Sequence, residues 1–191
     1  MKKDIKLSGV GGQGILTIAT VIGEAATEAG LHLKQAEVHG MSQRGGDVQS
    51  DLRLSTEAIH SDQIPVGGAD LIISMEPIEA LRYLPYLHEE GWVVTSSRPL
   101  VNIPNYPDAA AVADELAALP HVATLDIETV ARDNGVPRGA NMVLLGMAAR
   151  YFEILTADQL RTAIRHIFAR KGEQVVADNL KAFELGYGQP A

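Results

Sequence analysis

A glycine-rich segment near the start of the chain constrains the fold more than any other feature of the sequence. Gly9-Val10-Gly11-Gly12-Gln13-Gly14 satisfies the pattern G-x-G-x-x-G. It lies between a predicted strand at 5–8 and a predicted helix at 14–29, which Gly30 should end. His32–Val38 has the pattern of a second strand. We therefore predict a Rossmann-like βαβ opening whose two strands run parallel.

A third predicted strand, Asp47–Leu54, changes the expected topology. Only eight residues, 39–46, separate it from the second strand, whereas a parallel crossover needs about a dozen. It should therefore run antiparallel, which makes the sheet mixed. Further strands are predicted at 69–74, 92–96 and 121–126, and helices at 77–87, 109–119 and 141–155. A capping box of Thr156 and Gln159 should begin another helix, which Gly172 ends before a last helix through Leu185. The proline-rich segment Pro99–Pro107 is the best candidate for a surface loop.

Length and composition limit the class of protein. The 191 residues, 46% hydrophobic and 21% charged, predict a single globular domain, 1–191. A net charge of −8 is unfavourable for a generic nucleic-acid binder. The longest apolar run, 142–149, is too short to span a membrane, and no signal peptide is readable. We expect a soluble cytoplasmic protein with neither nucleic acid nor membrane as a partner.

The cysteine count is zero. This excludes disulfides, thiol nucleophiles and all-cysteine iron–sulfur clusters from this chain. None of the six histidines forms an H-x-H or H-E-x-x-H pair, so no metal site is predicted. We also assign no catalytic residue, because neither a G-x-S-x-G elbow nor a Walker loop occurs.

The glycine loop is the first candidate binding site. Glycines let the backbone turn sharply and let an anion approach the first N–H groups of the following helix. The candidate cofactor-binding residues are Gly9, Gly11, Gly12, Gln13 and Gly14. Glu37 lies 23 residues past Gly14, where a dinucleotide binder has its ribose-reading acid. The alternative is that these glycines only permit tight packing of the strand against the helix.

The segment after the second strand is the second candidate. At the end of that strand, beside the glycine turn, an α/β sheet usually binds its ligand. Arg44 suits a phosphate or carboxylate, and His39 suits proton exchange near neutral pH. The candidate substrate- or partner-facing residues are Glu37, His39, Gly40, Ser42, Gln43, Arg44, Gly45 and Asn141. A solvated loop is the alternative for this segment, and for Asn141 the simplest expectation is an N-cap of the helix at 141–155.

Three segments together resemble a known family. The glycine loop, 36–51 (AEVHGMSQRGGDVQSD) and 138–146 (RGANMVLLG) are similar to the gamma-type subunit or domain of 2-oxoacid:ferredoxin oxidoreductases. Within that family, the chain looks closest to the small (beta) subunits that act on indolepyruvate. The resemblance covers essentially the whole chain. It implies a three-layer α/β/α fold like domain III of pyruvate:ferredoxin oxidoreductase, with a mixed, mostly parallel sheet.

The resemblance also implies a function shared between two chains. A large (alpha) subunit would carry thiamine diphosphate and 4Fe–4S clusters, and the complex would convert an aryl 2-oxoacid and coenzyme A into acyl-CoA and CO2 while reducing ferredoxin. The absence of cysteine agrees with redox centres on another polypeptide. The glycine loop would contact the phosphate-bearing end of coenzyme A, and 37–46 would face the large subunit and the reacting centre. Two alternatives stay open: a stand-alone NAD-dependent dehydrogenase that uses Glu37, and a scaffold subunit that binds no ligand.

Overall fold

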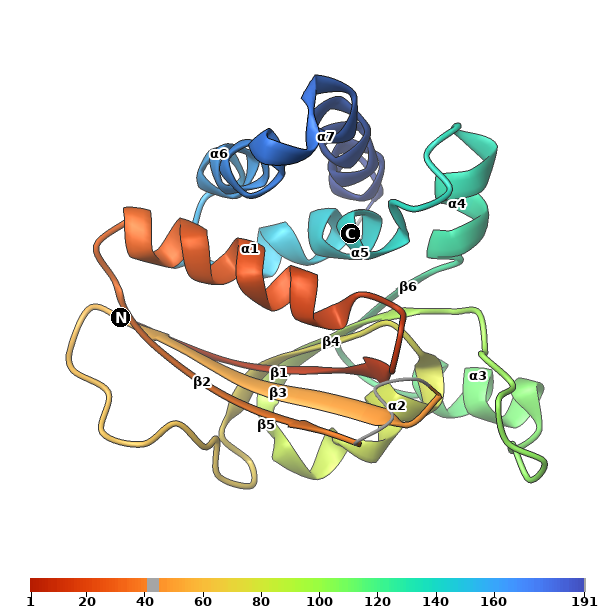
Figure 1. The fold of residues 1–191 in the computed structure, drawn as a ribbon. Helices are drawn as coiled ribbons and strands as arrows, with labels where there is room; N and C mark the ends of the chain where they lie inside the picture. Colours follow the sequence, from red (N-terminus) through yellow and green to blue (C-terminus); the bar gives the residue numbers. More distant parts are fainter. Residues whose placement is uncertain (41–44, 191) are drawn as a thin grey trace.

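The computed structural model describes residues 1–40 and 45–190. Within them, six strands form one sheet in the order β2-β3-β1-β4-β5-β6 (Figure 1). The strands are β1 Lys2–Val10, β2 His32–His39, β3 Asp47–Ser55, β4 Ala69–Ser74, β5 Leu87–Ser96 and β6 Val122–Leu125. β3 pairs antiparallel with β1 and β2, and β1, β4, β5 and β6 pair in parallel. The predicted mixed sheet and the antiparallel third strand are confirmed, and β1 and β2 run parallel with β3 between them.

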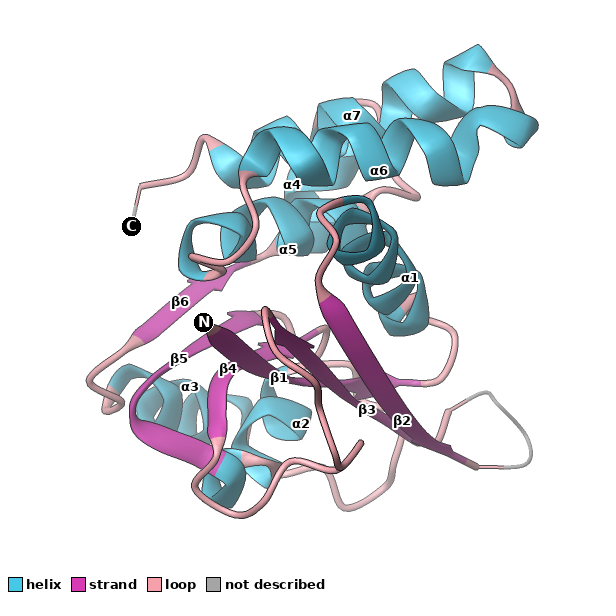
Figure 2. Cartoon of the chain, turned by 90° about the vertical axis from the view of Figure 1, so that its left-hand side faces the viewer, coloured by secondary structure: helices cyan, strands magenta, loops and turns pink. Residues whose placement is uncertain are grey.

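Helices cover both faces of the sheet (Figures 1 and 2). α2 Pro77–Arg82 and α3 Ala109–Ala117 lie below it, and α1 Ile15–Glu28 and α5 Ala140–Ala148 pack on the upper face. α6 Ala157–Phe168 and α7 Glu173–Tyr187 form a further tier above α1 and α5, and α4 Ile127–Asp133 lies beside α5. Short 3-10 helices span Leu84–Tyr86, Ala149–Tyr151 and Ala169–Lys171. Among the described helices, none is both long enough and apolar enough to cross a membrane.

The main core lies between the sheet and the upper helices. Apolar side chains of β1 and β3 pack there against one face of α1, where Ile18 and Ile22 are fully buried. α5 is buried all round, from Met142 to Ala148, because the sheet lies on one side of it and α7 on the other. A smaller cluster on the lower face joins Ile72 and Val93 to α2 and α3. This sandwich fixes the positions of the strand ends at which the site is built.

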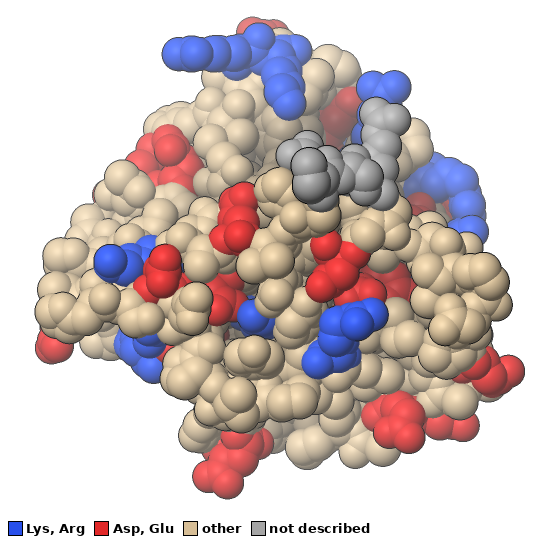
Figure 3. Space-filling view, turned by 60° about the horizontal axis from the view of Figure 1, so that its bottom comes forward, with Lys and Arg blue, Asp and Glu red and all other residues tan. Residues whose placement is uncertain are grey.

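The lower face of β1 and β3 carries buried ion pairs instead of an apolar surface. Arg53 Nε lies 2.8 Å from Asp4 Oδ1, and Lys6 Nζ lies 2.6 Å from Asp51 Oδ1. The Lys6 ammonium also stacks over the ring of Tyr83, at 4.8 Å from its centroid. Acidic and basic side chains are correspondingly interspersed on this side of the molecule (Figure 3).

The boundaries of several predicted elements were wrong. The helix predicted at 77–87 ends at Arg82, because Pro85 lacks the N–H that would continue the helical hydrogen bonding, and Leu87 begins β5. The helix predicted at 141–155 begins at Ala140 and ends at Ala148. The strands predicted at 5–8 and 92–96 are longer, namely β1 and β5, and α4 was not predicted.

Candidate functional site

The carboxyl ends of β1 and β4 form the switch point of the sheet. α1 leaves the end of β1 toward the upper face, and α2 leaves the end of the neighbouring β4 toward the lower face (Figure 1). The diverging connections leave a crevice at such a point, and ligands of open α/β sheets bind there. In this chain the crevice is bordered by the glycine loop 9–14 and by Met75 and Glu76.

The glycine loop leaves room for a ligand at one position. Gly12 has φ +103°, and a Cβ built on it would meet nothing within 4 Å. Gly14, with φ +88°, precedes α1 as an N-cap that has no side-chain cap. The first turn of α1 therefore presents main-chain N–H groups and the positive end of the helix dipole, both favourable for an anion.

The other end of the loop is occupied by the protein itself. The side-chain oxygen of Gln13 accepts from the Val10 N–H at 2.7 Å, and its amide nitrogen donates to the Met75 oxygen at 3.3 Å. A Cβ on Gly9 would lie 3.1 Å from the Cβ of Met75. Gly9 and Gln13 thus join the ends of β1 and β4, whereas Gly12 faces open space.

His39 meets the glycine loop at a shallow hollow. This hollow, of about 250 Å³, is lined by Gly11, Gly12, Thr17, His39 and the β3 residue Val48, among others. The predicted proximity of the end of β2 to the glycine turn is therefore confirmed. Glu37 precedes His39 on the same face of β2, is exposed, and accepts from Gln35 Nε2 at 2.6 Å. Ser42, Gln43 and Arg44 lie outside the described residues.

Gly45 and Gly46 pair with the glycine loop through the main chain. Gly11 N–H donates to the Gly46 oxygen at 2.8 Å, and Gly45 N–H donates to the Gly11 oxygen at 3.2 Å. From the far side, Asn102 Nδ2 donates to the Gly45 oxygen at 2.7 Å. The proline-rich segment 99–107 is thus a third wall of the site. The sequence predicted this segment only as a surface loop, and its position directly after a buried strand was the one feature that pointed to a place beside the site.

Glu76 anchors that third wall. Its buried carboxylate accepts from the main-chain N–H groups of Ile78 at 2.8 Å and Glu79 at 3.0 Å, as the N-cap of α2. The same carboxylate accepts from the Leu100 N–H at 3.2 Å and from the Tyr106 hydroxyl. Burial and the bond to Glu76 raise the pKa of Tyr106 above its ordinary value. Glu76 was missed, although an acid directly before Pro77 has the sequence signature of a helix N-terminus.

Asn141 connects the second helix of the site to the first. The N-cap of α5 is Gly139, so the predicted N-cap role of Asn141 was wrong. Its Nδ2 instead donates to the Gly14 oxygen at 3.2 Å, and its Oδ1 accepts from the Met142 N–H at 3.0 Å. A Cβ on Gly14 would lie 2.8 Å from Asn141 Nδ2. Asn141 therefore supports the glycine loop from behind.

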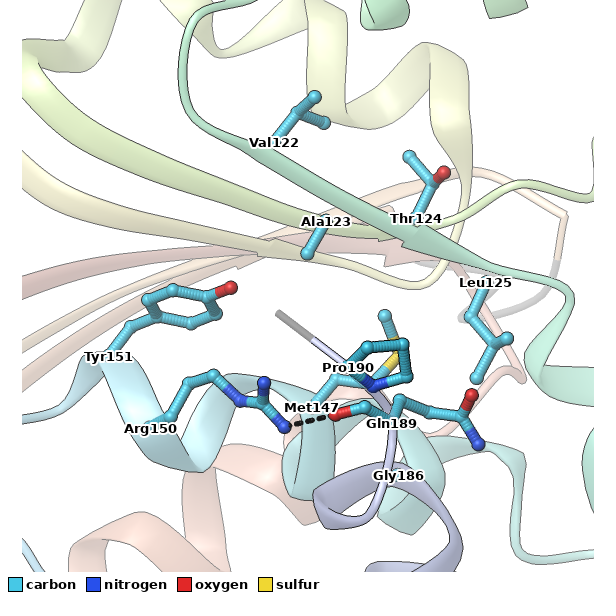
Figure 4. A pocket seen from close by; sticks show the side chains of 10 residues that line it. All are labelled: Val122, Ala123, Thr124, Leu125, Met147, Arg150, Tyr151, Gly186, Gln189 and Pro190. Atoms are coloured by element: carbon cyan, nitrogen blue, oxygen red, sulfur yellow. Dashed lines mark hydrogen bonds between the residues drawn. The ribbon is translucent and has the colours of Figure 1, made fainter.

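A second hollow, of about 230 Å³, lies between β6 and the ends of α5 and α7 (Figure 4). Its cation, Arg150, donates to the main-chain oxygens of Tyr187 and Gln189. The guanidinium is thus engaged at the C-terminal end of α7, where a positive charge is stabilising. The N-terminus of α1 at the glycine loop, in contrast, has no side-chain cap. We therefore locate the candidate site there.

One cluster of side chains has the composition of a metal site. Glu24, Glu28 and His166 lie within 4.8 Å of one another on the outer surfaces of α1 and α6. His166 Nδ1 lies 3.7 Å from Glu24 Oε1 and closer to the Glu28 carboxylate. The contacts join the two helices and lie away from the crevice.

Comparison with known proteins identifies the family. Residues 4–189 match the family described as pyruvate ferredoxin/flavodoxin oxidoreductase. The chain belongs to this family. The indolepyruvate oxidoreductase subunit IorB of Archaeoglobus fulgidus, one of its relatives, is 35% identical over 99% of this chain and 96% of its own length. The resemblance stated from the sequence is thereby confirmed.

Solved structures of family members share the fold. The keto/oxoacid ferredoxin oxidoreductase gamma subunit of Geobacter sulfurreducens covers 97% of this chain and 96% of its own, with a TM-score of 0.69 and 24% identity. The 2-oxoglutarate:ferredoxin oxidoreductase of Magnetococcus marinus, with 2-oxoglutarate, coenzyme A and succinyl-CoA bound, matches 99% of this chain with a TM-score of 0.75 and 22% identity. There the match spans 32% of a longer chain.

Proposed function

We propose that this chain is the small subunit of a 2-oxoacid:ferredoxin oxidoreductase that acts on indolepyruvate or a related aryl pyruvate. In this proposal the glycine-loop crevice forms the coenzyme A side of the active site. The supporting observation is the crevice of this chain, which belongs to the family. Gly12, which faces open space, and the uncapped N-terminus of α1 lie together at the switch point of the sheet. Relatives named as indolepyruvate oxidoreductase subunits, 35–37% identical to this chain, support the choice of indolepyruvate.

The donor set of this chain does not fit an iron–sulfur cluster. All-cysteine clusters need thiolates, and none of the 191 residues is cysteine. We therefore assign the 4Fe–4S clusters and thiamine diphosphate to a large (alpha) subunit, which also passes electrons to ferredoxin. The small subunit contributes walls and hydrogen bonds. A cytoplasmic location stays a prediction.

The residues of the crevice fit the phosphate-bearing end of coenzyme A. When bound, coenzyme A supplies the thiol that accepts the acyl group. Gly12 and the first N–H groups of α1 would hold a phosphate, and His39 would donate a hydrogen bond from the opposite wall. Arg44, from the sequence, would add a guanidinium contact to an anionic group. Glu37, Gly40, Ser42, Gln43 and Gly45 would face the large subunit around this point.

The NAD-dependent alternative is not favoured by the geometry. A dinucleotide binder reads the ribose with an acid on the strand next to β1. Here β3 lies between β1 and β2, so Glu37 is not on the strand next to β1, and unlike His39 it is not among the residues that line the hollow. Its carboxylate also accepts a hydrogen bond from Gln35. The scaffold alternative differs from the proposal only in whether the crevice contacts coenzyme A.

Reconstitution of the two-chain enzyme tests the proposal. The small chain is produced with and without the large subunit from the same genome, and 2-oxoacid- and coenzyme A-dependent reduction of ferredoxin is measured. We expect activity only when both chains are present, with iron found only on the large subunit. Tight binding of NAD to the isolated chain in equilibrium dialysis would support the dehydrogenase instead. Full activity of the large subunit alone would contradict a role for this chain in the reaction.

A further inference from the structure

Exposed apolar side chains gather at the mouth of the candidate site. In the proline-rich segment 99–107, here called the rim loop, Leu100 is 39% exposed, Val101 68% and Ile103 40%. Single exposed apolar residues are ordinary on a protein surface, but a group of them beside a site indicates an interaction surface.

The rim loop is held in place rather than left free. The buried carboxylate of Glu76 accepts from the Leu100 N–H at 3.2 Å and from the Tyr106 hydroxyl. Asn102 ties the tip to the Gly45 oxygen at 2.7 Å, and the prolines at 99, 104 and 107 fix further backbone angles. A loop whose backbone is already held in place loses less conformational entropy when a partner binds it.

The position of the rim loop indicates which partner covers it. Through Gly45 the loop is connected to Gly11, so a protein seated on the loop also lies against the crevice. In the Magnetococcus marinus oxidoreductase the same fold is 32% of a longer chain, the remainder of which is part of the same polypeptide. The Archaeoglobus fulgidus relative, in contrast, is named as a subunit and matches this chain over 96% of its own length, so the rest of such an enzyme lies on a separate polypeptide.

We infer that the rim loop is a docking surface for the large subunit, with Val101 and Ile103 as its apolar contacts. The inference rests on the proposed function and adds the surface through which the two chains meet. The large subunit presents an apolar recess to these two side chains and thereby closes the crevice over the glycine loop. The buried centre of a protein interface is apolar and depleted of charged residues, which is the environment that suits these two side chains.

Charge substitutions in the rim loop test this surface in the two-chain complex. Val101→Asp and Ile103→Asp each place a carboxylate where the partner is apolar. We expect the dissociation constant of the large subunit to rise by at least about tenfold, because burying an unpaired charge costs more than the roughly 1.4 kcal/mol that a tenfold change represents. Since Val101 is largely exposed, the melting temperature of the isolated chain should not change.

Val66→Asp is the matched control. Val66 is 72% exposed but lies before the amino end of β4, at the end of the strand opposite to the glycine loop. Its substitution should leave the dissociation constant unchanged. Equal binding of all three variants and the wild type, in a complex that is assembled and active, overturns the docking surface but not the proposed function. A loss of self-association, with binding of the large subunit unchanged, overturns it in favour of a second copy of this chain. Failure of the wild-type chains to associate overturns both.

Discussion

The side-chain amide of Asn141 donates a hydrogen bond to the main-chain oxygen of Gly14, 3.2 Å away and 127 positions earlier in the sequence. The bond joins the beginnings of α5 and α1 behind the glycine loop. Asn141→Ala should lower the free energy of unfolding by about 1 kcal/mol, which corresponds to a fall of about 2–4 °C in melting temperature. Asn134→Ala, which removes an exposed bond to the Val130 oxygen, should cost less. An equal cost for the two variants would contradict a special role for the Asn141 bond.

Gly186 sets the distance between α7 and α5. A Cβ at this position would overlap the main-chain oxygen of Val143, which a rigid helix cannot move away. Gly186→Ala should therefore destabilise the chain by about 3 kcal/mol or prevent its folding. Gly23→Ala is the control inside α1, where the new methyl group would meet only the flexible end of Leu33 at 3.3 Å. We expect the Gly23 variant to be as stable as the wild type or slightly more stable, because alanine favours the helix. The melting temperatures of the two variants test this, and equal values would contradict the role given to Gly186.

Glu76→Gln should loosen the rim loop. The carboxylate accepts four hydrogen bonds, and an amide would direct its own N–H groups toward one or more of those donors. We expect a loss of roughly 2 kcal/mol in unfolding free energy and faster limited proteolysis within 99–107. Glu57→Gln, on the exposed segment after β3, serves as the control. Unchanged proteolysis of the Glu76 variant would show that the loop does not depend on this anchor.

The stability contributed at Glu128 should depend on pH. Burial raises the pKa of this carboxyl above its ordinary value, although the bond from Ser96 Oγ, at 3.1 Å, partly offsets the rise. The folded chain then holds the proton more tightly than the unfolded chain, so stability falls as pH rises through the raised pKa. Glu128→Gln should therefore melt above the wild type at pH 8, and the difference should vanish toward pH 4. The same difference at both pH values, or the same effect for the exposed Glu115→Gln, would contradict this account.

The parts of the fold that depend on local pattern were predictable from the sequence. The apolar run Ala69–Ser74 is β4 with those bounds, and the capping box of Thr156 and Gln159 begins α6. The short link 39–46 predicted the antiparallel direction of β3, because chain length alone forbids a crossover. The end of α5 was not predictable in this way. Apolar residues continue past Ala148, so the sequence pattern does not show that the helix ends there. The chain then changes direction, and Glu153 takes a left-handed backbone conformation with φ +59°.

The candidate site was predictable only where its parts are close in the sequence or follow from the topology. The glycine loop and His39 belong to the first 39 residues, and their meeting follows from the parallel directions of β1 and β2. Asn141 was taken as an N-cap because asparagine favours that position locally, but the distant Gly14 oxygen holds its side chain. The contact of Asn102 with Gly45 likewise depends on the order of the strands, which no local pattern contains.

The Michaelis constant for coenzyme A in the reconstituted complex tests the central claim most directly. His39→Gln changes the wall opposite Gly12, and His32→Gln changes an exposed histidine at the other end of the same strand. If the crevice binds the phosphate-bearing end of coenzyme A, loss of one hydrogen bond to a charged group should raise the KM of the His39 variant roughly tenfold, with kcat retained. The His32 variant should match the wild type. Wild-type KM values for both variants would contradict a role of this crevice in binding coenzyme A.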